Sequence, residues 1–365
     1  MIPFLDLQQV NAPHQVRIQA AVARVVASGW YVLGPEVAAF EAAFARYVGV
    51  GHCIGVANGL DALVLVLKAW DLPAGSEVLV PANAYIASVL AIVQAGLVPV
   101  LVEPDPRTHT LDPARLLAAL TPRTRVVLPV HLYGRVTNMT PLMAFAATHG
   151  LLVLEDAAQA HGAVHAEKQA GTWGHAAAFS FYPTKNLGAL GDAGAITTND
   201  DALADRLRMW RNYGSAKKYH NDVPGHNSRL DELQAAILAE KLPFLSAENA
   251  HRRRLARHYL AHLAAPGLVL PPADALDHDV WHLFVVQHPR REALQTYLHQ
   301  NGIGTDIHYP VPPHHQPALA GQWPADAFPI ARQLHRQVLS LPLNPVLTLE
   351  QADRVVAVVN GFEPG

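Results

Sequence analysis

The sequence predicts an α/β protein built on a mostly parallel central sheet, followed by a smaller α+β region. Short apolar runs alternate with longer helical patterns through the first two thirds of the 365 residues. The runs are rich in β-branched side chains, as expected of strands that are covered on both faces. Strands that alternate with helices at this spacing pair in parallel. Because half of the residues are hydrophobic and only 16% are charged, the chain can bury a large core.

Seven apolar runs are the candidate strands of this sheet. Helical patterns follow several of them, for example GLDALVLVLKAW after the first run and AYIASVLAIVQAG after the second. The candidate strands are 53–58, 76–81, 97–104, 125–130, 151–156, 176–182 and 193–199.

The last third of the chain has a different organisation. After residue 200 the pattern is helical to about residue 264, and the proline-rich stretch 265–274 then indicates a boundary region. Beyond it, 280–287 is typical of a strand, and 290–302 and 349–362 are typical of helices. We therefore expect a large α/β domain over 1–245 with the N-terminal segment, and a smaller α+β domain over 246–365.

The composition argues against several classes of protein. A net charge of −3 gives no reason to expect nucleic-acid binding, because nucleic-acid binders usually carry a basic face. No run of 18 apolar residues predicts a membrane helix. The only cysteine, Cys53, suits a reducing cytoplasm. The start of the chain lacks the pattern of a signal peptide, so we expect a soluble cytoplasmic protein.

Common phosphate and metal motifs are also missing. The chain has no GxxxxGK[ST] motif, and GALGDAG spaces its glycines differently from the dinucleotide-binding GxGxxG. His161/His165 and His258/His262 have i,i+4 spacing, but they lack an HExxH motif or cysteine partners. We therefore expect no functional metal site.

One of only six lysines, Lys185, stands in the unusual stretch FSFYPTKNLGALGDAG (179–194). An amine among Phe181, Tyr182 and Leu187 is poorly solvated, which favours its neutral form. A neutral amine is what Schiff-base chemistry requires. The alternative is a structural ion pair, with Asp192 or with Asp156 as the partner.

Asp156 ends the candidate strand 151–156, and ligands of open α/β sheets bind at the carboxyl ends of strands. The alternative role for this residue is to cap the following helix. Pyridoxal 5'-phosphate is the cofactor that combines a lysine imine with a carboxylate, because an aspartate holds its pyridine nitrogen protonated.

A phosphate site is expected where a strand leads through Asn58 and Gly59 into a helix, since free N–H groups at a helix start bind phosphate. The Ser180 hydroxyl is a candidate additional contact, and Tyr85 is a candidate ring to stack on the cofactor. Taken singly, Asn58 and Gly59 favour an ordinary helix cap, and Tyr85 is equally consistent with a packed tyrosine at a helix start.

With these residues assembled, the chain resembles the pyridoxal-phosphate sugar aminotransferases of the DegT/StrS type, which have the aspartate-aminotransferase fold (fold type I). The resemblance extends over nearly the whole chain. The segments that carry it are IPFLDL, SGWYVLGPEVAAFEAAFARYVGV, VANGLDAL, PANAYIAS, HLYG, LEDAAQAHGA, SFYPTKNLGALGDAG, HNSRLDELQAA and DIHYP.

The resemblance implies a role for each matching residue of the cofactor site. Lys185 would bind the cofactor covalently and transfer protons, and Asp156 would pair with the pyridine nitrogen. Gln159 would lie near the phenolic oxygen, and Tyr85 would stack on the ring.

The resemblance also implies a phosphate site shared between two subunits. The backbone amides of Gly59 and Leu60 and the Ser180 hydroxyl would contact the phosphate. Asn227 from the second subunit would complete the site, so that the active enzyme is a homodimer. Residues expected to contact the sugar nucleotide are Trp30, Tyr31, Tyr182, His308 and Tyr309.

The implied reaction is amino transfer from L-glutamate to C-3 of a dTDP-3-keto-6-deoxyhexose. Gln159, GWYVLG and RNYGSAKKY resemble the C-3 enzymes, whereas C-4 enzymes more often have histidine at the position of Gln159. A sugar dehydratase or a non-catalytic regulatory homologue would have the same fold, although dehydratases replace the lysine with histidine. Glu167 and His175 depart from the family, which commonly has Gly and Asp there, and we expect both on a turn.

Overall fold

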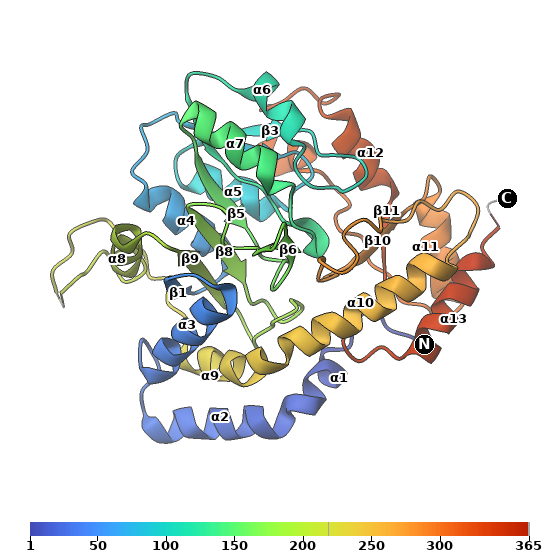
Figure 1. The fold of residues 1–365 in the computed structure, drawn as a ribbon, viewed down its shortest axis with the longest axis horizontal. Coiled ribbons are helices and arrows are strands. Elements are labelled where there is room, and N and C mark those ends of the chain that lie inside the picture. The colour runs from blue at the N-terminus through green and yellow to red at the C-terminus, as the bar shows by residue number, and fades with distance from the viewer. Residues whose placement is uncertain (218, 364–365) are drawn as a thin grey trace.

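The computed structural model of the chain describes residues 1–217 and 219–363, and Lys218 in the stretch RNYGSAKKY lies outside them. Within these residues a seven-stranded sheet has the order β1–β9–β8–β5–β4–β2–β3 (Figure 1). Its strands are β1 (His52–Val56), β2 (Glu77–Pro81), β3 (Val98–Val102), β4 (Thr124–Val127), β5 (Leu152–Asp156), β8 (Ala176–Ser180) and β9 (Gly194–Thr198).

Each predicted strand is present, and the sheet is mostly parallel. Only β9 runs antiparallel to its neighbours β1 and β8. The connection from β8 to β9, residues 181–193, contains no helix to carry a crossover, and the two strands pair antiparallel as a long hairpin. This connection carries Lys185.

Helices cover both faces of the sheet. One face packs against α4 (Gly59–Ala69), α5 (Ile86–Gln94) and α8 (Asp201–Trp210). The opposite face packs against α3 (Pro35–Val48), α7 (Met139–His149) and α9 (Glu232–Lys241). The sheet is therefore buried on both sides, which explains why its strands are apolar throughout.

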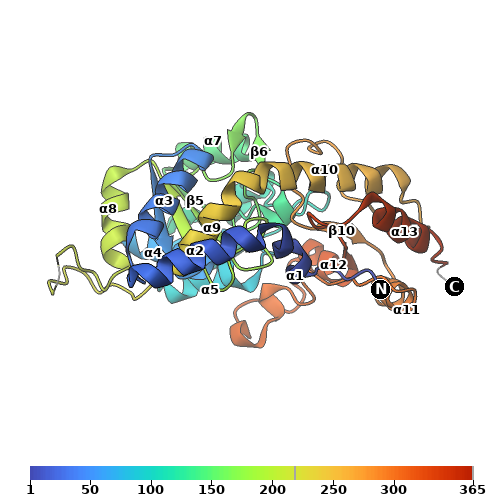
Figure 2. The ribbon, with the colours of Figure 1, turned by 90° about the horizontal axis from the view of Figure 1, so that it is seen from below.

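The C-terminal region has its own hydrophobic cluster, drawn from residues 255–362. The elements around it are α10 (Leu245–His262), β10 (Phe284–Gln287), α11 (Arg291–Gln300), β11 (Val338–Leu341) and α13 (Leu349–Asn360). Helix α12 (Pro329–Gln337) instead packs Ala331 into a cluster of the large sheet and Leu334 into a small cluster with β10 and β11. Figure 2 shows α10 extending from the side of the sheet to this region. The N-terminus also reaches it, since Ile2 pairs with Ile303.

The remaining elements are short, apart from α2. They are α1 (Leu7–Asn11), α2 (Gln15–Ser28), α6 (Leu116–Ala119), the hairpin β6 (Val164–His165) and β7 (Lys168–Gln169), and the 3-10 turns Ala12–His14, Pro113–Arg115, Leu132–Gly134, Leu242–Phe244, Pro313–His315 and Pro317–Leu319. Among the helices of the described residues, none is long and apolar enough to cross a membrane.

The prediction of continuous helix from 200 to about 264 is wrong in part. Between α8 and α9 the chain is irregular over 211–217 and 219–231, and Figures 1 and 2 both show this part of the chain extending away from the rest of the molecule. Gly214 has a φ of +74° and Gly225 approaches it closely, because a Cβ at Gly225 would lie 2.0 Å from the Gly214 nitrogen. This close turn interrupts the helix.

Candidate active site

Asp156 lies at the carboxyl end of β5 and faces α4 and α5. Side chains alternate along a strand, so Asp156 shares a face with Leu154, which packs in the cluster that includes those helices. The carboxylate is 6% exposed and accepts hydrogen bonds from Ser88 Oγ on α5 at 2.7 Å and from the Ala158 amide at 3.2 Å. The sequence analysis did not predict a role for Ser88. Its position one turn after Tyr85, at the start of α5, could have indicated that it lies near the site.

Lys185 lies in the connection between β8 and β9 and is half-buried. Burial lowers the pKa of its amine from 10.5 to about 8, against the opposing effect of the Asp156 charge. Within the described residues no hydrogen bond leaves Lys185 Nζ. Lys241 has the same lowered pKa of about 8, but its Nζ donates to the Gly188 carbonyl at 2.5 Å and to Asn11 Oδ1 at 2.9 Å.

Hydrogen bonds hold the Lys185 loop, residues 181–193, at its two ends and at Asn186. The Phe181 amide donates to the Ala193 carbonyl, and the Ala189 amide donates to the Phe181 carbonyl, both at 2.8 Å. Asn186, next to the lysine, donates to Asn249 Oδ1 of α10 at 2.8 Å and to the Val280 carbonyl at 3.0 Å. Helix α10 therefore holds the loop that presents the amine.

Backbone segments converge closely at the start of α4, where a phosphate site was predicted. A Cβ on Gly59 would lie 2.7 Å from Ser180 Cβ, so only glycine lets the helix start approach the end of β8 this closely. A Cβ on Gly194 of β9 would lie 2.4 Å from the Asn58 carbonyl carbon. Asn58 Oδ1 caps the helix by accepting from the Asp61 amide at 2.8 Å, which leaves the amides of Gly59 and Leu60 at its open end.

Gln159 connects β5 to the C-terminal region. Its Oε1 accepts from the Tyr133 amide at 2.6 Å, and its Nε2 donates to the Tyr309 hydroxyl at 2.9 Å. The Tyr309 ring lies 4.8 Å from the Tyr85 ring, centroid to centroid. The Tyr133 hydroxyl in turn donates to the His308 carbonyl. Gln159, Tyr309, Tyr85 and His308 of the predicted site are therefore linked by contacts, in part through Tyr133. Tyr133 belongs to the sequence segment HLYG but was not predicted as a site residue.

Two neutral histidines accompany Lys185 and were not predicted. His161 lies 5.6 Å from the rings of both Phe179 and Phe181, and burial lowers its pKa to about 3, with the Lys185 charge as a second cause. Burial and the Lys185 charge also hold the pKa of His282 well below its usual value. Neither ring adds a positive charge beside the amine at neutral pH. The sequence signal for His161 was its place in LEDAAQAHGA.

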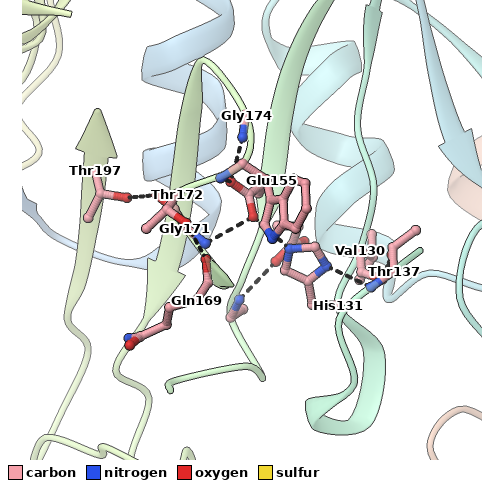
Figure 3. Close-up of polar contacts among 12 residues, drawn as sticks. Val130, His131, Thr137, Glu155, Gln169, Gly171, Thr172, Gly174 and Thr197 are labelled. Atoms are coloured by element: carbon pink, nitrogen blue, oxygen red, sulfur yellow. Dashed lines mark hydrogen bonds and ion pairs between the residues drawn. The ribbon is translucent and has the colours of Figure 1, made fainter. Parts of the chain in front are cut away.

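On the opposite face of β5, Glu155 forms a closed network with His131 (Figure 3). Glu155 accepts from His131 Nε2 at 2.8 Å and from the amides of Gly171, Trp173 and Gly174 at 2.8 to 2.9 Å. His131 Nδ1 accepts from the Thr137 amide at 3.2 Å, so the ring proton lies on Nε2. Both residues are fully buried.

Some predicted site residues stand apart in this single chain. Trp30 and Tyr31 lie between α2 and α3 and are 58% and 50% exposed, and the Trp30 indole donates to the Val32 carbonyl. Asn227 is exposed in the extended segment, where it bridges to Asn212. Among the described contacts, none joins these three residues to Lys185 or Asp156. Tyr182 is 51% exposed, three residues before the lysine.

Comparisons with known proteins identify the family. A model of the DegT/DnrJ/EryC1/StrS aminotransferase family matches residues 14–360. The chain is 53% identical over 362 residues to a dTDP-3-amino-3,6-dideoxy-alpha-D-galactopyranose transaminase of Aneurinibacillus thermoaerophilus, covering 99% of both chains.

Solved structures are similar over nearly the whole chain. DesV of S. venezuelae, crystallised in complex with a ketimine intermediate, is 49% identical with a TM-score of 0.96, covering 98% of this chain and 97% of that one. NtdA from Bacillus subtilis, with bound cofactor PMP, is 33% identical with a TM-score of 0.92, covering 98% and 84%. The predicted fold class and enzyme class are confirmed: the chain belongs to the DegT/DnrJ/EryC1/StrS aminotransferase family.

Proposed function

We propose that this aminotransferase moves an amino group from L-glutamate to C-3 of a dTDP-3-keto-6-deoxyhexose, giving a dTDP-3-amino-3,6-dideoxyhexose and 2-oxoglutarate. The observation that carries the proposal is the unpartnered, half-buried amine of Lys185 close to the buried carboxylate of Asp156. The choice of sugar is supported by the 53% identity to a transaminase named for a dTDP-3-amino-3,6-dideoxygalactose.

The residues of the site fit pyridoxal 5'-phosphate as the cofactor. The glycines at 59 and 194 keep a cradle open that any Cβ would fill, at a helix N-terminus suited to a phosphate. Ser180 borders this cradle. Asp156 has a second acceptor oxygen beyond its bond to Ser88, as an aspartate holding a pyridine nitrogen needs. Tyr85 precedes α5 and offers a half-exposed ring one turn before Ser88, the residue that bonds this carboxylate.

When bound, the cofactor supplies an electrophilic carbonyl and an electron sink. Lys185 Nζ would hold that carbonyl, and the same amine would be the group that takes up and gives back a proton. A pKa of about 8 leaves about a tenth of the amine neutral at pH 7, against roughly three parts in ten thousand at the ordinary value. Asp156 holds the proton on the pyridine nitrogen, and its bond from Ser88 fixes the carboxylate.

A homodimer would complete this site, with Asn227 of one subunit reaching the phosphate of the other. The exposed aromatic side chains of Trp30, Tyr31 and Tyr213, together with Leu190 behind the lysine loop, support an interface here. We assign Trp30, Tyr31, Tyr182, His308 and Tyr309 to sugar-nucleotide binding. The buried Cys53 agrees with a cytoplasmic site of action.

The decisive experiment offers the purified enzyme dTDP-3-keto-6-deoxyglucose or its galacto epimer with L-glutamate. Mass spectrometry and NMR should identify a sugar aminated at C-3. Turnover of a 4-keto sugar alone would refute the C-3 assignment. Product that forms without any amino acid would indicate a dehydratase, and a protein that develops no imine absorbance with the coenzyme would indicate a regulatory role.

A further inference from the structure

A cavity of about 330 Å³ lies beside the lysine loop, between the N-terminal segment and the C-terminal region. Its polar lining comes from Thr184, Arg252, His282, Asp306 and His308. None of the residues assigned to the cofactor lines it, whereas His308, assigned above to the sugar nucleotide, does. The volume is at the lower end for small-ligand pockets, which suits an amino acid better than a nucleotide sugar.

Arg252 of α10 contributes a buried positive charge to this cavity. It is 4% exposed, and its described hydrogen bonds all leave from Nη1 and end on carbonyl oxygens, those of Leu343 at 3.0 Å and of Trp281 and His282 at 3.4 Å. Among the described residues no carboxylate forms an ion pair with it. Burial lowers its pKa to about 10, so the guanidinium remains charged at neutral pH.

The cavity is close to the reacting amine. Thr184 precedes Lys185 directly, and His308 precedes Tyr309, which contacts Gln159 and Tyr85. The charge of Lys185 is among the causes that lower the pKa values of both His282 and His308, as expected if both rings lie near Nζ. A ligand in the cavity therefore lies beside the loop that carries Lys185.

We propose that this cavity receives the amino donor, whose carboxylate binds the free side of the Arg252 guanidinium. The N–H donors of a guanidinium match the two oxygens of a carboxylate. Because Arg252 forms no ion pair with an acidic residue among the described residues, these donors are available to a ligand. Asp306 lines the same cavity and is exposed, so its negative charge favours a ligand that also carries an ammonium group over a plain dianion. The inference rests on the proposed function, because it requires an α-amino acid as donor.

The test measures the two half-reactions separately through the absorbance of the bound cofactor. The donor half-reaction uses the enzyme with pyridoxal phosphate and L-glutamate alone. The acceptor half-reaction uses the pyridoxamine form and the keto-sugar nucleotide. Arg252→Gln should weaken L-glutamate binding at least about tenfold, since loss of one partner of a buried charge pair costs that much or more, while the acceptor half-reaction remains within about twofold.

Arg254→Gln is the matched control, because it removes the same charge from an exposed position on the same helix. It should leave both half-reactions unchanged. Leu5→Phe narrows the cavity while keeping the arginine, and should also raise the L-glutamate concentration needed for half saturation. Thermal melting would reveal whether Arg252→Gln is folded. If it is not, the Leu5→Phe variant still tests the inference.

A direct binding measurement adds a readout besides turnover. L-Glutamate should raise the melting temperature of wild type and of Arg254→Gln, and should not raise that of Arg252→Gln. Equal losses in both half-reactions, or an unchanged donor half-reaction in both cavity variants, would overturn the inference. A wild-type enzyme that reacts with L-glutamate but not with the keto-sugar refutes the proposed substrate and leaves the donor subsite standing.

Discussion

Adjacent residues of β5 have opposite characters on the two faces of the sheet. Glu155 has four hydrogen-bond donors and is completely buried. Asp156, one residue later, has two donors and retains slight exposure. A saturated carboxylate has no capacity left for a ligand, so its function is structural. An unsaturated one at the carboxyl end of a parallel strand is available for chemistry.

The two buried lysines repeat this contrast. Burial lowers both pKa values to about 8, so the pKa alone does not separate them. Lys241 donates to two oxygens, one of them in the Lys185 loop, and thereby supports that loop from α9. Lys185 has an amine without an acceptor. Free hydrogen-bonding capacity, more than a perturbed pKa, distinguishes the reactive group from the structural one.

The largest expected effect is the loss of activity when Lys185 is replaced. Lys185→Ala should lower kcat for amino transfer by roughly a thousandfold or more, because the proton carrier is removed. The variant should still bind the coenzyme without a covalent bond. Lys241→Met, its counterpart, should lower the melting temperature but keep kcat within about tenfold. Full transaminase activity in Lys185→Ala would show that the assignment is wrong.

The neighbouring carboxylates should separate catalysis from stability. Asp156→Asn should reduce kcat by about 100-fold, the order of effect seen when a preorganised electrostatic group is removed. Glu155→Gln should instead lower the free energy of unfolding by about 2–4 kcal/mol, because an amide leaves buried backbone donors unpaired. Steady-state kinetics and denaturant unfolding should be measured on both variants. If the two variants lose kcat and unfolding free energy to similar extents, the distinction between the two carboxylates is wrong.

The amine of Lys185 also predicts a dependence of stability on pH. Its pKa is lower in the folded cofactor-free chain than in the unfolded chain, so folding is disfavoured below pH 8 and the penalty fades as pH rises from about 8 to 10.5. Lys185→Met should therefore be more stable than wild type by about 1–3 kcal/mol at pH 7. At pH 10.5 the difference should be much smaller. A constant difference from pH 7 to 10.5 would argue against the burial of this charge.

Much of this arrangement could be predicted from the sequence, because strand ends and motif residues are local signals. Asp156 and Ser180 end the adjacent parallel strands β5 and β8, and Gly59 at the start of α4 approaches Ser180 closely. The strand β11 was missed because its four residues gain their pairing only from β10, which is distant in sequence. The place of Asn227 relative to any phosphate depends on a second subunit, and the roles assigned to the site residues stay predictions.

The smallest expected effect concerns the turn of the β6–β7 hairpin, next to the loop that holds Glu155. Glu167 has a φ of +65°, where the family commonly has glycine, which agrees with the turn expected there. Glu167→Gly should raise the free energy of unfolding by up to about 1 kcal/mol, because it relieves a left-handed backbone strain. Kinetics should not change. Glu167→Ala keeps the strain and serves as the control in the same denaturant titration.

The lysine loop has a consequence for how the enzyme acquires its cofactor. The two ends of the loop are joined by backbone hydrogen bonds. Lys241 of α9 bonds to Gly188 of the loop, and Asn249 of α10 bonds to Asn186. Binding then requires little ordering of the protein, which removes one of the main costs of association. The segment that presents the amine is thus already ordered in the cofactor-free chain, and the proposed coenzyme would meet a lysine that is held in place.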